Sequence, residues 1–255
     1  MAEQDRIDMQ RVDTDRKSLP VWGPWQTTGL GFAIFIINLF TQTGVFLVLA
    51  FREYALNQPG DILDMLTSLA TNGSLVSVAV IASSAAGVAM VLVFIKARRR
   101  ASIGEYLSLK PLTGRQIGVS LAVVAGLIAV AELANSGMGQ TPDTGFNYQI
   151  YRSADPLALL WIAAVVFAPW FEEFFFRGFL FAGWLRSRLG SVGTVAVTSA
   201  LWAVLHIQYS AYGIVQILVI GVVLGIMRLR TKSLWSPLLM HFAWNMTGMI
   251  AFAVG

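Results

Sequence analysis

The sequence predicts an all-α protein, a polytopic transmembrane helix bundle with about seven spans, eight being the alternative. Three observations lead to this fold class. Hydrophobic residues make up 56% of the 255-residue chain and charged residues only 13%, which is about half the charged share of a typical soluble domain. The mean hydropathy is +0.66. Apolar stretches near the roughly 20 residues that a transmembrane helix needs recur along the chain, and helices satisfy their backbone polar groups in lipid.

Seven apolar stretches account for the predicted spans. They comprise residues 28–51, 74–95, 117–133, 156–184, 192–207, 212–227 and 234–254. The fourth stretch is too long for a simple span, and Pro169 is a point at which it could divide, because proline interrupts helical hydrogen bonding. The fifth is short. Residues 1–27 are polar and mixed in charge and are predicted to form a cytosolic tail, ahead of one transmembrane domain over residues 28–255.

The distribution of lysine and arginine orients the predicted bundle. Fifteen of the 18 basic residues lie in the N-terminal tail or at loops on one side, Arg52 and Arg152 lie in the opposite loops, and Arg177 lies within a span. The positive-inside rule places the fifteen in the cytoplasm. We therefore expect a multi-pass protein of the cell membrane with a cytoplasmic N-terminus. The net charge of +4 reflects this asymmetry, and no nucleic-acid partner is expected.

Ionisable residues inside the spans are candidate functional residues, because charge in hydrocarbon is costly. They are Glu172, Glu173, Arg177, His206 and His241. The chain has no cysteine, which excludes disulfides, thiolate chemistry and zinc–thiolate sites. A further acid near the outer end of the third span, Glu132, is expected to snorkel toward the membrane surface.

Helix geometry separates the two adjacent glutamates. Glu173 and Arg177 are four residues apart, so they share a helix face and can form an ion pair. Glu172 is rotated by about 100° and points elsewhere. The spacing of four also places His241 and Asn245 on one face of the last span.

The depths of these polar residues match across three spans. A rise of about 1.5 Å per residue places Glu172, His206 and Asn245 roughly 21, 22 and 20 Å from the cytoplasmic ends of their helices. Trp202 shares a helix face with His206. A lone polar residue in a membrane helix often only bonds a neighbouring helix, at roughly 0.6 kcal/mol. Two adjacent acids at mid-membrane are a costly way to hold helices together, so the pattern favours a functional polar site.

Three motifs carry a resemblance to a known family. The chain reads EEFFFR from Glu172, WAVLH from Trp202 and HFAWN from His241, each in its own apolar stretch. The order EExxxR, aromatic-x-x-x-His and HxxxN is similar to the CPBP family, the CAAX proteases and bacteriocin-processing enzymes also called Abi-type intramembrane proteases. The resemblance covers about residues 157–254. The second motif usually begins with Phe, and we interpret Trp202 as a packing substitute.

The resemblance implies an intramembrane endopeptidase that hydrolyses a peptide bond of a membrane-associated protein or peptide at the lipid bilayer. By this analogy Glu172 activates a water molecule with the assistance of His206, while His241 and Asn245 form an oxyanion hole. No metal or other cofactor is implied. A carboxylate can serve as general base, and an imidazole and an amide one turn apart can donate to one oxyanion.

By the same resemblance Glu173 and Arg177 support the structure. Two alternatives stay open at the level of the sequence. One is a zinc-dependent intramembrane metalloprotease with Glu172, His206 and His241 as ligands, although the chain has no HExxH motif. The other is a non-catalytic membrane scaffold or immunity protein. A proton-relaying transporter is disfavoured because the sequence shows no inverted repeat.

Overall fold

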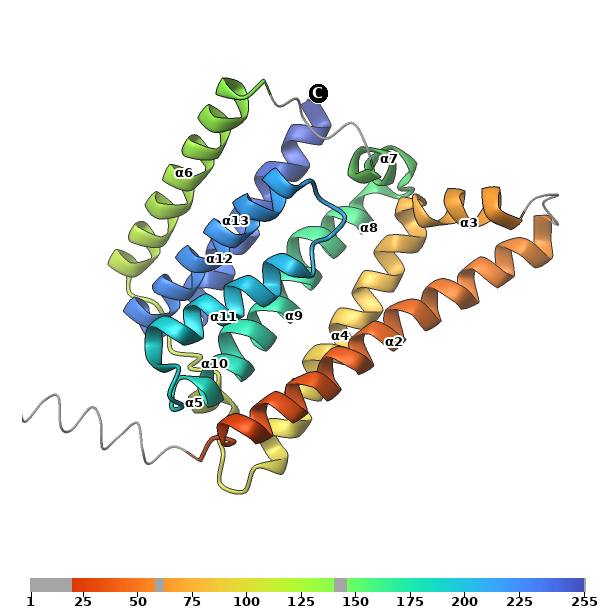
Figure 1. Cartoon of the computed structure of the whole chain (residues 1–255). Helices are drawn as coiled ribbons and strands as arrows, with labels where there is room; N and C mark the ends of the chain where they lie inside the picture. Colours follow the sequence, from red (N-terminus) through yellow and green to blue (C-terminus); the bar gives the residue numbers. More distant parts are fainter. Residues whose placement is uncertain (1–19, 58–61, 140–145, 255) are drawn as a thin grey trace, which may run out of the picture.

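The computed structural model describes residues 20–57, 62–139 and 146–254. Most of the predicted N-terminal tail, residues 1–19, lies outside this range. The described residues form helices and connecting turns, and no strand occurs among them. This confirms the all-α fold class. Figure 1 shows long helices side by side, with the shorter ones near their ends.

Six helical segments are long and apolar enough to cross a membrane. They are α2 (Pro24–Asn57), α4 (Gly73–Ala97), α6 (Gly114–Gly137), the segment Leu157–Trp184, α12 (Ala211–Thr231) and α13 (Trp235–Val254). Each overlaps a predicted span. Four of them, α2, α4, α6 and α12, extend beyond it at both ends, and the other two begin one residue inside it. The remaining predicted span, the fifth (residues 192–207), corresponds to α11 (Gly190–Val204), which is apolar but shorter.

The segment Leu157–Trp184 is not divided at Pro169. It runs through α8 (Leu157–Trp161), η1 (Ile162–Phe167), α9 (Ala168–Glu172), η2 (Glu173–Leu180) and α10 (Phe181–Trp184). The two η elements are π-helical, which the sequence did not indicate. Pro169 stands in the first turn of α9, where the missing N–H is tolerated because the preceding winding is already wider. The alternative of eight spans therefore has no counterpart among the described helices.

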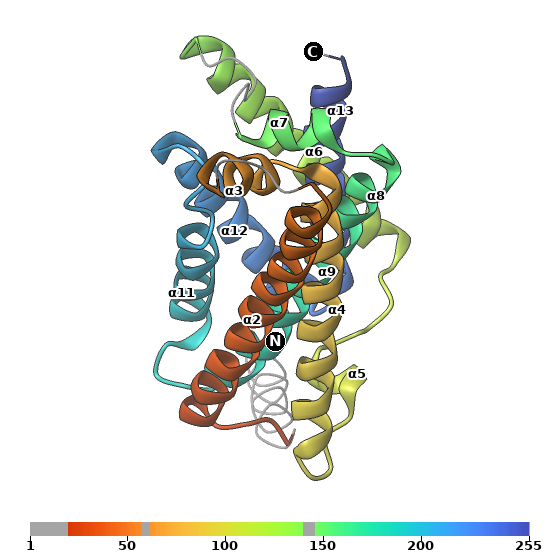
Figure 2. The ribbon, with the colours of Figure 1, turned by 90° about the vertical axis from the view of Figure 1, so that its right-hand side faces the viewer.

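Three short helices were not predicted. They are α3 (Ile62–Ala70), α5 (Ile103–Tyr106) and α7 (Phe146–Ser153). They lie near the ends of the long helices in Figure 2. The prediction of residues 192–207 as one helix is wrong at its end, because α11 stops at Val204. The N–H of His206 reaches back three residues, to the carbonyl of Ala203, and the following residues form turns.

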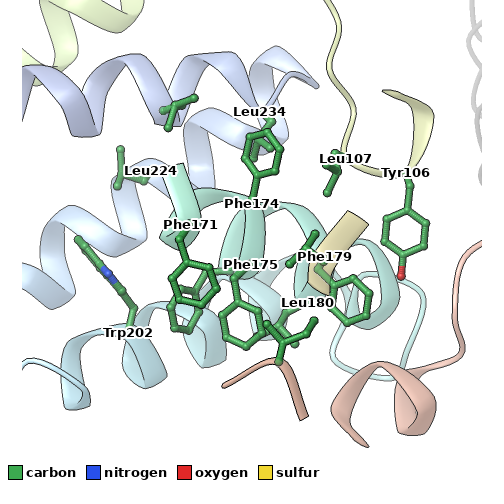
Figure 3. Close-up of a cluster of buried hydrophobic side chains, with 14 of the residues drawn as sticks. Tyr106, Leu107, Phe171, Phe174, Phe175, Phe179, Leu180, Trp202, Leu224 and Leu234 are labelled. Atoms are coloured by element: carbon green, nitrogen blue, oxygen red, sulfur yellow. The ribbon is translucent and has the colours of Figure 1, made fainter. Parts of the chain in front are cut away.

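The aromatic side chains of the central segment form much of the core. Phe174 and Phe179 are buried, and the cluster extends to Leu224 of α12 and Leu234 just before α13 (Figure 3). Gly87 of α4 lets this helix approach closely, since a Cβ atom there would lie 2.3 Å from the ring of Phe171. The packing fixes the central segment among its neighbours and thereby places the two glutamates.

Candidate active site

The two glutamates lie where the central segment changes from α-helical to π-helical winding. Glu172 is the last residue of α9, and Glu173 is the first residue of η2. Single π-helical turns are frequent at functional sites, because the extra residue in the turn redirects side chains. The side chain of Glu173 is fully buried, whereas 21% of the side chain of Glu172 is exposed. Adjacent in sequence, the two carboxylates thus occupy different environments.

Arg177 forms the ion pair that the spacing predicts. Its Nη1 donates to Oε1 of Glu173 at 3.0 Å, and both side chains are fully buried. The Nη2 atom donates to the carbonyl oxygen of Gly221 on α12 at 3.2 Å. The guanidinium carbon lies 4.6 Å from the centre of a Trp202 ring, within the range of a cation–π interaction. Arg177 therefore joins the central segment to α11 and α12.

Glu172 is held by a residue that the sequence reading treated as packing only. The indole Nε1 of Trp202 donates to Oε2 of Glu172 at 2.5 Å. A phenylalanine at this position has no such donor, so the interpretation of Trp202 as a simple packing substitute is incomplete. The same ring packs edge-on against His206 and His241, with 5.1 Å between ring centres in both cases. In the sequence, the one sign of this role is that Trp202 stands where the second motif usually has Phe.

His206 lies just beyond the end of α11. Its Nδ1 is 2.8 Å from the carbonyl oxygen of Trp202. A carbonyl oxygen only accepts hydrogen bonds, so Nδ1 carries the proton in this contact. In the neutral ring the lone pair then resides on Nε2. The contact also satisfies one of the last carbonyl groups of the helix, a role that histidine often takes at helix C-termini.

His241 of α13 lies between the two glutamates. Its Nδ1 is 2.9 Å from Oε1 of Glu173, and its Nε2 is 3.8 Å from Oε2 of Glu172. The carboxylate of Glu173 accepts from Nδ1–H and fixes the orientation of the ring. The remaining ring nitrogen, Nε2, thus faces the second carboxylate.

Asn245 anchors α13 to the central segment. Its Nδ2 donates to the carbonyl oxygen of Ala164 at 2.8 Å. In this π-helical stretch the N–H of Ala168 bonds the carbonyl of Ala163, five residues back. In the same five-residue pattern, the partner of the Ala164 carbonyl would be the N–H of residue 169. That residue is Pro169, which has no N–H, so the carbonyl of Ala164 is free for the side chain of Asn245. One N–H of the amide is used in this contact and a second remains.

The four candidate catalytic residues line one cavity of about 160 Å³. They come from the central segment, the end of α11 and α13, as the matching depths predict. Residues that the sequence reading did not single out complete the wall. They include Tyr209, Gly213, Gln216 and Trp244. Gln216 and Trp244 sit in apolar helical stretches of the sequence, where no spacing distinguishes a cavity wall from a lipid-facing or packed residue.

The zinc alternative requires three side chains that converge on one metal ion. Among the described residues, no group of three or more His, Asp and Glu side chains is arranged to hold a metal ion. Glu172, His206 and His241, the alternative zinc ligands, line the same cavity without forming such a group. Instead, Nδ1 of His206 contacts the carbonyl oxygen of Trp202, and Nδ1 of His241 contacts the carboxylate of Glu173.

The fold and this cavity define a polytopic membrane protein with a partly buried carboxylate–imidazole–amide site. Residues 154–247 match the family model described as type II CAAX prenyl endopeptidase Rce1-like. The match contains all three motifs and is consistent with the resemblance to the CPBP family of intramembrane proteases. It supports an intramembrane endopeptidase in general, a hydrolase with a protein or peptide substrate. Neither the curated proteins nor the solved structures gave a match.

Proposed function

We propose that the protein hydrolyses a peptide bond within the membrane by a water molecule that Glu172 activates. One observation carries the proposal. Glu172, His206, His241 and Asn245, drawn from three separate segments, line the same cavity. A water molecule and an extended substrate backbone would meet there beside a carboxylate that is only partly exposed. The reaction needs no metal in this proposal.

Glu172 acts as the general base. It takes a proton as the water oxygen adds to the scissile carbonyl carbon, and it returns that proton to the amine as the carbon–nitrogen bond breaks. Trp202 holds one carboxylate oxygen in place at 2.5 Å. His206 assists by accepting a hydrogen bond from the water at Nε2, the nitrogen left free when Nδ1–H bonds the carbonyl of Trp202.

His241 and Asn245 stabilise the oxyanion of the tetrahedral intermediate. Asn245 keeps a second N–H after donating to Ala164. Nε2 is the ring nitrogen of His241 that remains available, because Nδ1 is held by Glu173. In this proposal the ring of His241 carries protons on both nitrogens, so that Nδ1–H donates to Glu173 and Nε2–H donates to the oxyanion. Nε2–H and the amide N–H are then two donors for one developing charge, and preorganised donors of this kind are often the largest single contribution to catalysis.

Glu173 and Arg177 position the site without contacting the substrate. Both are fully buried, and Glu173 reaches the site only through His241. Because Arg177 pairs with Glu173, the charged carboxylate of Glu173 can lie beside the cavity without leaving an unpaired charge in the interior. The substrate is a membrane-associated protein or peptide, and the protein works in the cell membrane with its N-terminus in the cytoplasm.

The proposal is tested by comparing new protein N-termini in membranes of cells that express the wild type, Glu172→Gln or Glu105→Gln. Glu105 is an exposed glutamate of α5, so its variant controls for the loss of a carboxylate away from the cavity. We expect N-termini that appear with the wild type and with Glu105→Gln and are missing with Glu172→Gln. Identical sets for all three proteins would contradict the proposed activity and favour the scaffold.

A further inference from the structure

Helix α11 is too short to cross the membrane by itself. Its 15 residues correspond to a length of roughly 22 Å, against about 30 Å for the hydrocarbon core of a bilayer. The chain completes the crossing through residues 205–210, which are not helical, before α12 begins (Figure 1). Backbone of this kind is tolerated at membrane depth only where protein buries it or where it lines a water-filled cavity.

The segment 205–210 is not buried by protein. Ile207 is 79% exposed, and Gln208 is exposed as well. Within the described chain the N–H groups of these two residues have no hydrogen-bond acceptor. Unpaired backbone donors require water, since each costs free energy when it is buried without a partner. The segment therefore borders a hydrated region.

The segment that borders this hydrated region also borders the candidate active site. His206 and Tyr209 belong to the segment and line the cavity of about 160 Å³. A second cavity of about 100 Å³ shares Gln216 and Trp244 with the first and extends to Ala251 near the end of α13. Its wall includes Glu132, the acid that was expected to snorkel, and the side chains of Asn135 and Gln216. The two cavities are neighbours that share two wall residues, and together they extend from Glu172 toward the end of the bundle at which α13 terminates.

The opposite direction is closed. On that side of the cavity the ion pair of Glu173 and Arg177 is fully buried. Leu224, Leu234 and Met240 are at most 1% exposed and pack in the same core. Among the described residues, this packing separates the cavity from the end of the bundle at which α13 begins.

Charge identifies the two ends of the bundle. The loops at the closed end carry most of the basic residues, such as Arg99 and Lys110, whereas Arg52 and Arg152 are the basic residues of the open end. The positive-inside rule then assigns the closed end to the cytoplasm. We infer that the catalytic cavity is hydrated from the non-cytoplasmic face of the membrane. A second step rests on the proposed function: the substrate is an exported or membrane-anchored polypeptide whose scissile bond lies at that face or in the outer half of the bilayer.

The natural absence of cysteine makes the inference directly testable. Single cysteines are introduced as Gln216→Cys in the cavity wall, Val219→Cys and Arg230→Cys. Val219 is the matched control, because it lies on the same helix three residues away and is 50% exposed on the apolar surface. Arg230 is exposed near the cytoplasmic end of α12. Right-side-out and inside-out vesicles are treated with a charged, membrane-impermeant thiosulfonate, and the labelled fraction is measured.

We expect Gln216→Cys to be labelled in right-side-out vesicles at least about tenfold faster than Val219→Cys, because the thiolate that reacts forms in water and not in lipid. Arg230→Cys is expected to be labelled only in inside-out vesicles. Labelling of Gln216→Cys from the cytoplasmic side alone would overturn the inference. The inference would also be overturned if Gln216→Cys were labelled in neither kind of vesicle and became labelled only after denaturation.

The substrate class has its own readout in the N-terminal comparison. Cleavage sites that depend on Glu172 are expected in segments exposed at the non-cytoplasmic face or in the outer half of a span. Sites confined to cytoplasmic C-termini would overturn the assignment of the substrate. The labelling experiment does not require catalysis, so a protein that is labelled as expected and cleaves nothing would refute the proposed function and leave the outward opening intact.

Discussion

Trp202 and Glu172 are joined across two helices by one short hydrogen bond. The indole N–H of α11 donates to the carboxylate at the end of α9 at 2.5 Å, and the same ring lies 4.6 Å from the guanidinium carbon of Arg177. The two contacts use different parts of the indole. The ring face stabilises the buried cation, and the ring N–H orients the carboxylate that faces the cavity. A phenylalanine reproduces the first contact and loses the second.

Replacing Trp202 by Phe therefore separates packing from orientation. We expect Trp202→Phe to fold and to lower kcat about tenfold with little change in KM, since a hydrogen bond to a charged group contributes about 1.5–3 kcal/mol and about 1.4 kcal/mol corresponds to a factor of ten in rate. Turnover of a peptide identified by the N-terminal comparison provides the measurement. Trp244→Phe is the control, because Trp244 lines the same cavity and, among the described contacts, makes no hydrogen bond to Glu172. Equal losses in both variants would assign the effect to cavity shape.

The ion pair behind the site controls stability. Glu173→Gln or Arg177→Ala leaves one charge unpaired in the interior, at a cost of about 3–5 kcal/mol. We expect both variants to yield less folded protein and a lower Tm in detergent, whereas Glu172→Gln should melt like the wild type. The double variant Glu173→Gln/Arg177→Gln removes both charges and should recover part of the lost stability. A Glu173→Gln protein with the melting temperature and activity of the wild type would contradict the structural role.

Much of the site followed from the sequence because it depends on helical spacing and depth. The pair of Glu173 and Arg177 is a property of one helix face, and the common depth of Glu172, His206 and Asn245 follows from distances along single helices. Such relations are local and survive any arrangement of the spans that keeps their direction.

Other features depend on how the helices meet, and the sequence alone did not reveal them. The bond from Trp202 to Glu172 and the contact between Nδ1 of His241 and Glu173 each join separate helices. The π-helical winding around Pro169 depends on Asn245 satisfying the carbonyl of Ala164, a partner 81 positions along the chain. The early end of α11 likewise depends on a side chain, since the ring of His206 bonds a terminal carbonyl.

Asn245 and Glu172 are predicted to differ in the activity that remains after their removal. Glu172→Ala removes the base and should leave essentially no turnover. Asn245→Ala removes one of two oxyanion donors and should retain measurable turnover, reduced by about 100- to 1000-fold. Single-turnover assays on the purified proteins give the comparison, and melting curves report the loss of the bond to Ala164 separately. Complete inactivity of a well-folded Asn245→Ala protein would argue that its role exceeds that of one donor.

Metal dependence separates glutamate chemistry from the zinc alternative. The cavity offers one carboxylate and two imidazoles, which zinc accepts as ligands, yet Nδ1 of each ring contacts a protein oxygen and the three side chains do not converge on one point. We expect protein purified in detergent to contain no stoichiometric zinc by elemental analysis. Turnover should also persist after prolonged incubation with ortho-phenanthroline.

The chelator is itself hydrophobic and can enter a membrane cavity, so its non-chelating meta isomer serves as the control. Equal, small inhibition by both isomers agrees with Glu172 activating the water without a metal. Activity that disappears only with the chelating isomer and returns on addition of zinc would refute the proposed mechanism. His206 and His241 would then be ligands, and Glu172 would be either the third ligand or the base that takes a proton from zinc-bound water, whose acidity the metal increases.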